Sequence, residues 1–206
     1  MQDDLDIPNY TRPAPLKRKP FDKRKFILGA LAVVCAVVVL SLVWMLVWYF
    51  FSFSTYRNAK DGVEIKYPKS WAVKVHPVKD ILAAFISPKD NALDTFNENA
   101  NLSIYDNSKD PLTTEEYVNR IVLQMEAVFK DMRMVSRSSF PVAGRRGYRL
   151  VFAARGDVPL IVMVYAVIIE DAGYNLLYIG AVDKFPKDKP LLDIMALLLK
   201  LKGPEA

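Results

Sequence analysis

The residues that could carry out chemistry in this chain form three groups: one histidine, a loop rich in Asp and Asn, and a stretch rich in arginine. His76 has no second histidine with which to share a metal ion, and the only cysteine, Cys35, lies within an apolar run. Structural zinc sites take about four ligands, mostly Cys and His. A Ser-His-Asp hydrolase would combine His76 with a G-x-S-x-G turn, and the sequence has no such turn. We therefore interpret His76 as a surface or turn residue.

The second group is a set of carboxylates interspersed with asparagines, namely Asp90, Asp94, Glu98, Asp106 and Asp110. Oxygen ligands of this kind suit calcium, and two carboxylates held about 5–9.5 Å apart can hydrolyse a glycosidic bond. The spacing matches no EF-hand, and Asn and Asp also favour turns. We interpret the segment as a polar loop, with calcium binding and a carboxylate-dependent hydrolase as alternatives. The sequence contains no Walker or dinucleotide-binding glycine motif, so we predict no cofactor.

The third group lies between Asp131 and Asp157, an interval without acidic residues, and comprises Arg133, Arg137, Arg145, Arg146, Arg149 and Arg155. If this part of the chain is a strand with Leu150 and Phe152 on one face, Arg149 and Arg155 fall on the other, which we expect to be solvated. A guanidinium group suits carboxylates and phosphates. An acidic partner or an anionic lipid headgroup would then bind at Arg145, Arg146, Arg149 and Arg155. The alternative is a solvated face balanced by acids elsewhere in the fold.

An apolar segment precedes all three groups. Residues 26–53 carry no charge, and as a helix these 28 residues would extend about 42 Å, against a hydrocarbon core about 30 Å thick. Aromatic residues gather at its C-terminal end, as is typical of the headgroup level. The predicted anchor residues are Phe26, Trp44, Trp48 and Tyr49. Because the apolar region of a cleaved signal peptide is shorter, we predict a retained transmembrane helix.

Positive charge is concentrated just before this segment. Six cations occur within nine residues, namely Lys17, Arg18, Lys19, Lys23, Arg24 and Lys25. By the positive-inside rule, residues 1–25 form a cytoplasmic basic tail, residues 26–53 span the cell (inner) membrane, and residues 57–203 form an extracytoplasmic domain. The basic cluster acts as a topology determinant, with anionic-lipid binding as the alternative. Nucleic acid is not an expected partner outside the cytoplasm, although the net charge is +5.

The rest of the chain alternates between strand and helix patterns. Residues 62–67 and 71–75 alternate apolar and polar side chains around a short turn, which predicts a hairpin. Further strands are predicted at residues 81–87 and 101–106. Thr113-Thr114-Glu115-Glu116 matches a capping box, which predicts a helix that continues to about residue 130. Its predicted buried face carries Val118, Ile121, Val122, Met125, Val128, Phe129 and Met132.

Four apolar segments joined by short turns follow this helix, at residues 134–142, 147–154, 160–170 and 174–182. Short connections predict an antiparallel meander, because parallel neighbours need longer crossovers. Asp188-Lys189-Pro190 then predicts the start of a closing helix over residues 191–201. The fold class is therefore α+β, an antiparallel sheet flanked by helices and preceded by one transmembrane helix.

Two short motifs indicate a family. Tyr67-Pro68-Lys69-Ser70-Trp71 follows the first strand, and Glu98-Asn99-Ala100-Asn101 enters a later one. Both motifs, and the order of later elements over residues 60–202, resemble PsbP-like domains, which are named for an extrinsic subunit of photosystem II. The resemblance implies an α/β/α sandwich around an antiparallel sheet. Photosynthetic members are usually soluble lumenal proteins, whereas domains of this kind in bacterial envelopes are often treated as binding or assembly modules.

Together these features predict a non-enzymatic, single-pass membrane protein. Its partners would be the lipid bilayer and another membrane or envelope protein, on which the external domain docks or which it stabilises. The sequence leaves the oligomeric state open.

Overall fold

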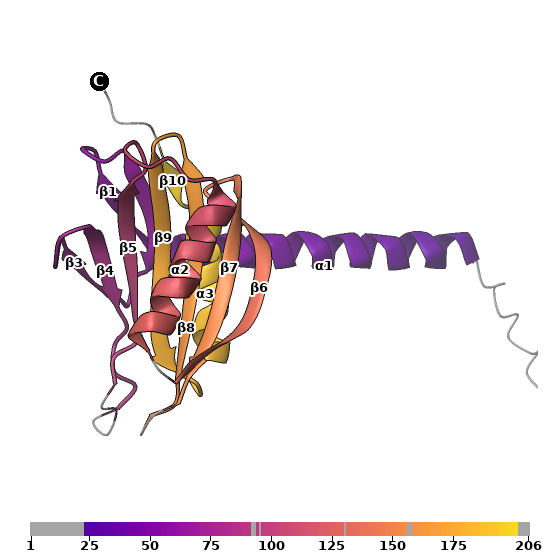
Figure 1. Ribbon diagram of the computed structural model, residues 1–206. Helices are drawn as coiled ribbons and strands as arrows, with labels where there is room; N and C mark the ends of the chain where they lie inside the picture. Colours follow the sequence, from indigo (N-terminus) through magenta and orange to yellow (C-terminus); the bar gives the residue numbers. More distant parts are fainter. Residues whose placement is uncertain (1–22, 92–93, 95, 130, 156–157, 202–206) are drawn as a thin grey trace, which may run out of the picture. The chain divides into compact units, whose positions relative to one another are not determined.

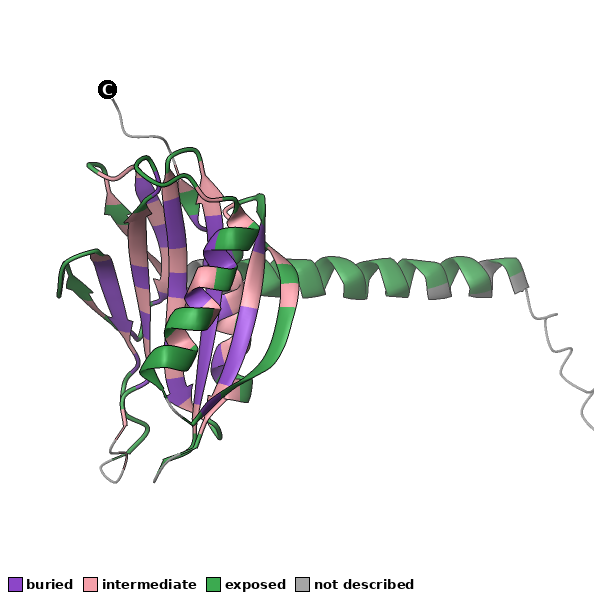
Figure 2. Ribbon diagram, viewed as in Figure 1, coloured by how far each residue is buried: buried purple, intermediate pink, exposed green. Residues whose placement is uncertain are grey.

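The computed structural model describes residues 23–91, 94, 96–129, 131–155 and 158–201 (Figure 1). The chain divides into two units, residues 1–47 and 48–206. Helix α1 (Lys23–Ser52) contains a window, Ile27–Trp48, that is long and apolar enough to cross a membrane. Every described side chain in this window is exposed (Figure 2). An exposed apolar surface of this extent is typical of a segment that meets lipid or protein rather than water.

The predicted anchor and topology residues are only partly visible in the structure. Trp44 and Trp48 lie on α1 with exposed side chains, and the backbones of Phe26 and Tyr49 belong to the same helix. Lys23, Arg24 and Lys25 form its first turn. Lys17, Arg18 and Lys19 lie outside the described residues.

The described residues of the second unit form two antiparallel sheets and two further helices. The strands are β1 (Phe53–Asn58), β2 (Val63–Pro68), β3 (Ala72–Val75), β4 (Ile81–Ile86), β5 (Asn99–Asp106), β6 (Met132–Val142), β7 (Arg145–Ala154), β8 (Leu160–Ile169), β9 (Ala172–Ala181) and β10 (Lys200–Leu201). The helices are α2 (Thr114–Val128) and α3 (Phe185–Leu197). The seven-stranded sheet has the order β3-β4-β5-β9-β8-β7-β6, and the three-stranded sheet the order β1-β2-β10. The predicted meander is confirmed, since β6, β7, β8 and β9 pair in sequence order.

The large sheet is covered on both faces. On one face α2 packs with Tyr117, Val118 and Ile121 against side chains of β6, β7 and β8. On the other face lie α3 and residues of β2, with Ile65, Leu192 and Met195 fully buried. Strand β8 is apolar along nearly its whole length because both of its faces are covered. The predicted α+β sandwich with helices on an antiparallel sheet is therefore confirmed.

Helix α2 begins at the predicted capping box. Glu116 N donates to Thr113 Oγ1 at 3.3 Å, and Thr113 N donates to Glu116 Oε2 at 2.8 Å. The prediction of its buried face is correct for Val118 and Ile121 but wrong for Val128 and Phe129, which are exposed. The helix ends at Val128, and Met132, the last residue of the predicted stripe, is buried as predicted but lies on β6.

The predicted hairpin of residues 62–67 and 71–75 is wrong. Strand β2 pairs with β1 and β10, whereas β3 pairs with β4 in the other sheet. The chain passes from one sheet to the other at the turn in which Trp71 N donates to the Pro68 carbonyl at 2.9 Å, and Trp71 is buried there. An alternation of apolar and polar side chains indicates that a strand has one buried and one exposed face, but it does not indicate which strand pairs with it.

The closing helix begins and ends earlier than predicted. Helix α3 starts at Phe185 with Pro186 in its first turn, and it ends at Leu197. Asp188 is not a cap; it is buried inside the helix and accepts a hydrogen bond from Tyr178 Oη at 2.8 Å. Residues Lys200 and Leu201, predicted as helix, instead form β10 against β2.

Candidate functional site

The arginine-rich stretch occupies β6 and β7, at one edge of the seven-stranded sheet (Figure 1). Cross-strand partners point to the same face of a sheet. Arg137 lies opposite Leu150, whose side chain packs with α2, so Arg137 points to the α2 face. Arg133 lies opposite Ala153, which packs with the other core cluster, so Arg133 points to the α3 face.

Arg149 also points to the α3 face, and there it is a structural residue. Its Nη1 donates to Asp193 Oδ1 at 2.9 Å, and its guanidinium stacks 5.1 Å from the ring centroid of Phe140. Tyr165 Oη donates to the same Asp193 oxygen at 2.5 Å, and Lys189 Nζ donates to Oδ2 at 2.7 Å. The expectation of a solvated Arg149 is wrong, because α3 covers this part of the sheet. We call these four residues, Arg149, Tyr165, Lys189 and Asp193, the α3 clasp.

The ionisation of the α3 clasp favours the paired state. Burial by itself would raise the pKa of Asp193, but hydrogen bonds from Lys189, Tyr165 and Arg149 outweigh it and lower that pKa. Burial and the neighbouring carboxylate of Asp193 raise the pKa of Tyr165. The aspartate is therefore charged and the tyrosine neutral, as a clasp between sheet and helix requires.

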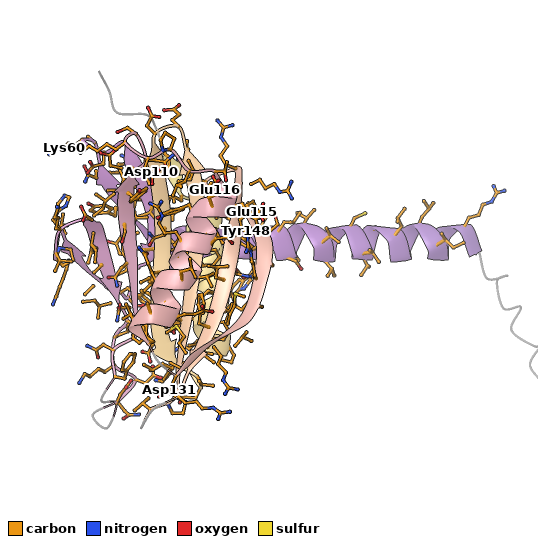
Figure 3. The ribbon with its side chains drawn as sticks, viewed as in Figure 1. Lys60, Asp110, Glu115, Glu116, Asp131 and Tyr148 are labelled. Atoms are coloured by element: carbon orange, nitrogen blue, oxygen red, sulfur yellow. The ribbon has the colours of Figure 1, made fainter. Side chains whose placement is uncertain are left out.

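Arg137 binds α2 on the opposite face. It donates to Asn119 Oδ1 at 2.8 Å and lies 3.5 Å from a carboxylate oxygen of Glu115. Its guanidinium also lies 5.0 Å from the centroid of the Tyr148 ring. Figure 3 labels Glu115 on α2 and Tyr148 on the strand beneath it. Arg137 therefore helps to hold the helix on the sheet.

The remaining arginines of the stretch are exposed: Arg133, Arg145, Arg146 and Arg155. Arg145 and Arg146 begin β7 and Arg155 follows its last residue, so about 30 Å of strand separates them. Arg133 lies near Arg155, because Arg133 pairs with Ala153. The four residues predicted to bind an anion together, Arg145, Arg146, Arg149 and Arg155, are thus divided between two ends of a strand, and one of them belongs to the α3 clasp.

The acidic residues of the asparagine-rich loop are also engaged within the fold. Asp90 and Asp94 form ion pairs with Lys184 at the start of α3, and Asp90 also pairs with Lys187. The hydrogen bond that Lys184 donates to Asp90 lowers the pKa of Asp90 and raises the pKa of Lys184. Asp110 pairs with Arg120 at 2.8 Å. The loop is therefore fastened to α3.

Two carboxyl groups near this loop are buried. Glu98 is 3% exposed and accepts a hydrogen bond from Ser87 Oγ at 2.8 Å. Burial raises the pKa of Asp188, although the hydrogen bond from Tyr178 acts in the opposite direction. Neither carboxyl group lines the cavity described below. Among the described residues, no group of three or more His, Cys, Asp or Glu side chains is arranged to hold a metal ion.

His76 lies in the turn between β3 and β4 with a positive φ of 46°. Its Nε2 is 3.5 Å from Asn58 Nδ2, and the side chain is exposed. This placement agrees with a turn histidine.

Sequence reasoning missed a cavity of about 450 Å³ that opens at one end of the sheets. The turns β1–β2, β6–β7 and β8–β9 meet there, and they contribute the charged residues Lys60, Asp61, Arg145, Glu170 and Asp171. Figure 3 labels Lys60 at this end of the domain. Basic and acidic groups are mixed in the lining, so the cavity favours neither an anion nor a cation. No local pattern could have indicated it, because its walls come from three distant turns and from residues of β5, β9 and β10.

The comparisons with known proteins concern the fold. No family model and no curated protein matches the sequence. Solved structures that match include the cyanobacterial PsbP, CyanoP, of Synechocystis, with a TM-score of 0.55 and 17% identity over 73% of this chain and 93% of that one. The Ran-binding protein Mog1p of Saccharomyces cerevisiae matches with a TM-score of 0.55 and 8% identity, over 73% and 96% of the two chains.

LpqN of Mycobacterium tuberculosis, which is involved in cell envelope biogenesis, matches with a TM-score of 0.51 and 9% identity over 73% of this chain and 90% of that one. At these identities the matches establish the fold alone. The domain has a PsbP-like fold, as the sequence motifs predicted.

Proposed function

We propose that this protein is a single-pass membrane protein whose PsbP-like domain is a non-enzymatic module that binds and stabilises another membrane or envelope protein. One observation carries the proposal: two acids of the asparagine-rich loop and Arg149 are held in ion pairs within the fold, while a long sheet edge is left open. Asp90 and Asp94 pair with Lys184, and Arg149 pairs with Asp193. The outer edge of β6, by contrast, pairs with no other described strand.

The fold comparisons support a binding role. Mog1p is named as a Ran-binding protein, LpqN is involved in cell envelope biogenesis, and CyanoP is a cyanobacterial PsbP. A shared fold does not transfer a partner from one protein to another. The comparisons support a binding role only in that the same fold occurs in one protein named for binding and in another involved in envelope biogenesis.

Anchoring is supported by α1. Its apolar window of 22 residues suits a bilayer, and Trp44 and Trp48 lie near the C-terminal end, where rings favour the headgroup level. The six cations at residues 17–25 support a cytoplasmic N-terminus by the positive-inside rule. The PsbP-like domain then lies on the outer side of the cell (inner) membrane.

Affinity capture tests the binding role. The full chain with a C-terminal tag is extracted from its own membranes in a gentle detergent, and a chain that ends after Ser54 serves as the anchor-only control. We expect a stoichiometric companion with the full chain and none with the control. Repeated recovery of a monomer without a companion would contradict the proposed function.

A further inference from the structure

We infer that the outer edge of β6 is the docking surface and that the partner contributes an extended acidic segment, which pairs with β6 as an eighth strand of the large sheet. This inference rests on the proposed function and specifies its surface and the chemistry of its partner.

Strand β6 is a long edge strand. Strand β6 has 11 residues and is the last strand of the seven-stranded sheet, so it is paired through β7 alone among the described residues. The unpaired N–H and C=O groups of an edge strand are a template for another strand. Strand β3, at the opposite edge, has only four residues. The β6 edge therefore offers the longer template.

A regular stretch lies within this edge. The register with β7 shifts between Met134 and Ser136, which places a bulge at Val135, and Pro141 has no N–H to donate. Between them, residues 136–140 pair with β7 without interruption. The bulge and the proline limit strand addition to this five-residue stretch, which we call the docking stretch.

The positive charge around the docking stretch indicates that the partner segment is acidic. Arg133, Arg146 and Arg155 are exposed around the docking stretch, and no ion pair to another described residue engages them. Strands β6 and β7 carry no acidic residue of their own. Carboxylates of an incoming strand would meet these guanidinium groups at the rim of the new pairing.

Two other binding partners, a second copy of this chain and a lipid headgroup, fit the edge less well. A second copy pairing through its own β6 would bring further arginines and no carboxylate to this edge, because β6 contains Arg133 and Arg137 and no acidic residue. A lipid phosphate accepts hydrogen bonds but cannot donate to the exposed carbonyl groups of the edge. A polypeptide segment offers both donors and acceptors.

Apolar contacts are available at one end of the edge. Val135 is 63% exposed and Met134 is 44% exposed. Val128 and Phe129, at the end of α2, are exposed just before β6 begins. An acidic segment with an apolar residue at this end would cover these side chains, which gives the pairing a direction.

Site-specific photocrosslinking in native membranes tests the location. Benzoylphenylalanine replaces Ser136 in the full chain, and the same probe at Lys74, on the opposite edge strand β3, is the control. We expect crosslinking from position 136 to a partner segment rich in Asp and Glu, at least fivefold above position 74. Adducts to lipid, to a second copy or to a segment without acidic residues would overturn the inference.

Charge reversal tests the recognition. Arg133→Glu with Arg146→Glu should reduce the captured companion at least tenfold, whereas Lys74→Glu with Lys79→Glu, the same change in net charge near the other edge, should leave it unchanged. Circular dichroism shows that both pairs of variants are folded. Equal capture by the two pairs would overturn the inference.

Amide hydrogen exchange on the captured complex tests the pairing itself. Alternate amides of residues 136–140 should exchange at least tenfold more slowly in the complex than in the free chain, and unchanged exchange there would overturn strand addition. If the wild-type chain captures its companion but position 136 does not crosslink, the docking surface alone is contradicted. If the chain captures nothing, the proposed function fails first.

Discussion

The α3 clasp predicts a large loss of stability when Asp193 is replaced by alanine. Three donors converge on this carboxylate, Tyr165 Oη at 2.5 Å, Lys189 Nζ at 2.7 Å and Arg149 Nη1 at 2.9 Å. Tyr165 is fully buried, so its hydroxyl loses its charged acceptor without access to water, which costs about 1–3 kcal/mol. The cations keep partial access to water, so each lost pair adds about 0–1 kcal/mol. We expect Asp193→Ala to lower the free energy of unfolding by about 1–5 kcal/mol.

A double-mutant cycle isolates the tyrosine contribution. Tyr165→Phe removes the hydroxyl together with its need for a partner and should cost only about 0.5–1.5 kcal/mol. The double variant should then be less destabilised than the sum of the two single variants, by about 1 kcal/mol or more. The assay is urea unfolding of the full chain in mild detergent, followed by the sheet signal in circular dichroism. Glu126→Ala, an exposed acid on α2, is the control and should change little.

The pH dependence of the same variant has a definite sign. Because the pKa of Asp193 lies below its ordinary value of 3.8, its contribution is present above that value and is lost as the pH falls through the folded-state pKa. The stability difference between wild type and Asp193→Ala should therefore be constant from neutral pH to about pH 5 and shrink below about pH 4. The α3 clasp would be refuted if the effects of Asp193→Ala and Tyr165→Phe were strictly additive. It would also be refuted if the stability difference between wild type and Asp193→Ala grew as the pH falls.

Three further predictions concern stability. Thr113→Ala removes the capping box of α2 and should cost about 1 kcal/mol of unfolding free energy, measured by urea titration; an unchanged midpoint would contradict the assignment. Gly180→Ala would place a Cβ in steric overlap with the ring and Oη of Tyr178, so we expect a loss of about 1–3 kcal/mol of unfolding free energy, and a variant as stable as wild type would show that the ring can move aside. The pKa of Asp188 is raised by burial, so ionising it costs stability as the pH rises above the ordinary value of 3.8. Asp188→Asn should therefore gain stability relative to wild type as the pH rises above about 4, and parallel pH profiles would contradict a raised pKa of Asp188 in the folded chain.

Local chemistry predicted the elements that depend on neighbours in the sequence. The capping box at Thr113 marked the start of α2, and short turns marked the meander from β6 to β9. These features are local because a cap satisfies donors within one turn and a hairpin joins adjacent strands.

Pairing over longer distances could not be predicted in the same way. Strand β2 finds its partners in β1, which continues directly from the apolar helix, and in β10, which is more than 130 residues away. The two-residue strand β10 shows no alternation of its own. The sequence therefore indicated a hairpin where the chain in fact changes sheets.

In the candidate site, too, local features were predictable and long-range contacts were not. Alternation along β7 correctly separated Arg149 from Leu150, but its partner Asp193 lies 44 residues further on. The pairing of Lys184 with Asp90 spans 94 residues. Which arginines remain exposed, and which become structural, depends on contacts that only the folded chain brings together.

Thiol labelling combined with crosslinking tests the central claim most directly, namely that an anchored domain lies outside the cytoplasm and binds a partner. Lys109, which is exposed, is replaced by cysteine in a Cys35→Ser background, and Thr11→Cys in the same background is the cytoplasmic control. We expect an impermeant maleimide to label the Lys109→Cys chain in intact cells and the Thr11→Cys chain only after permeabilisation. Lysine crosslinking of the same membranes should join the domain to one specific protein. Labelling of the Lys109→Cys chain only after permeabilisation, or correct labelling without any crosslinked neighbour, would contradict the account.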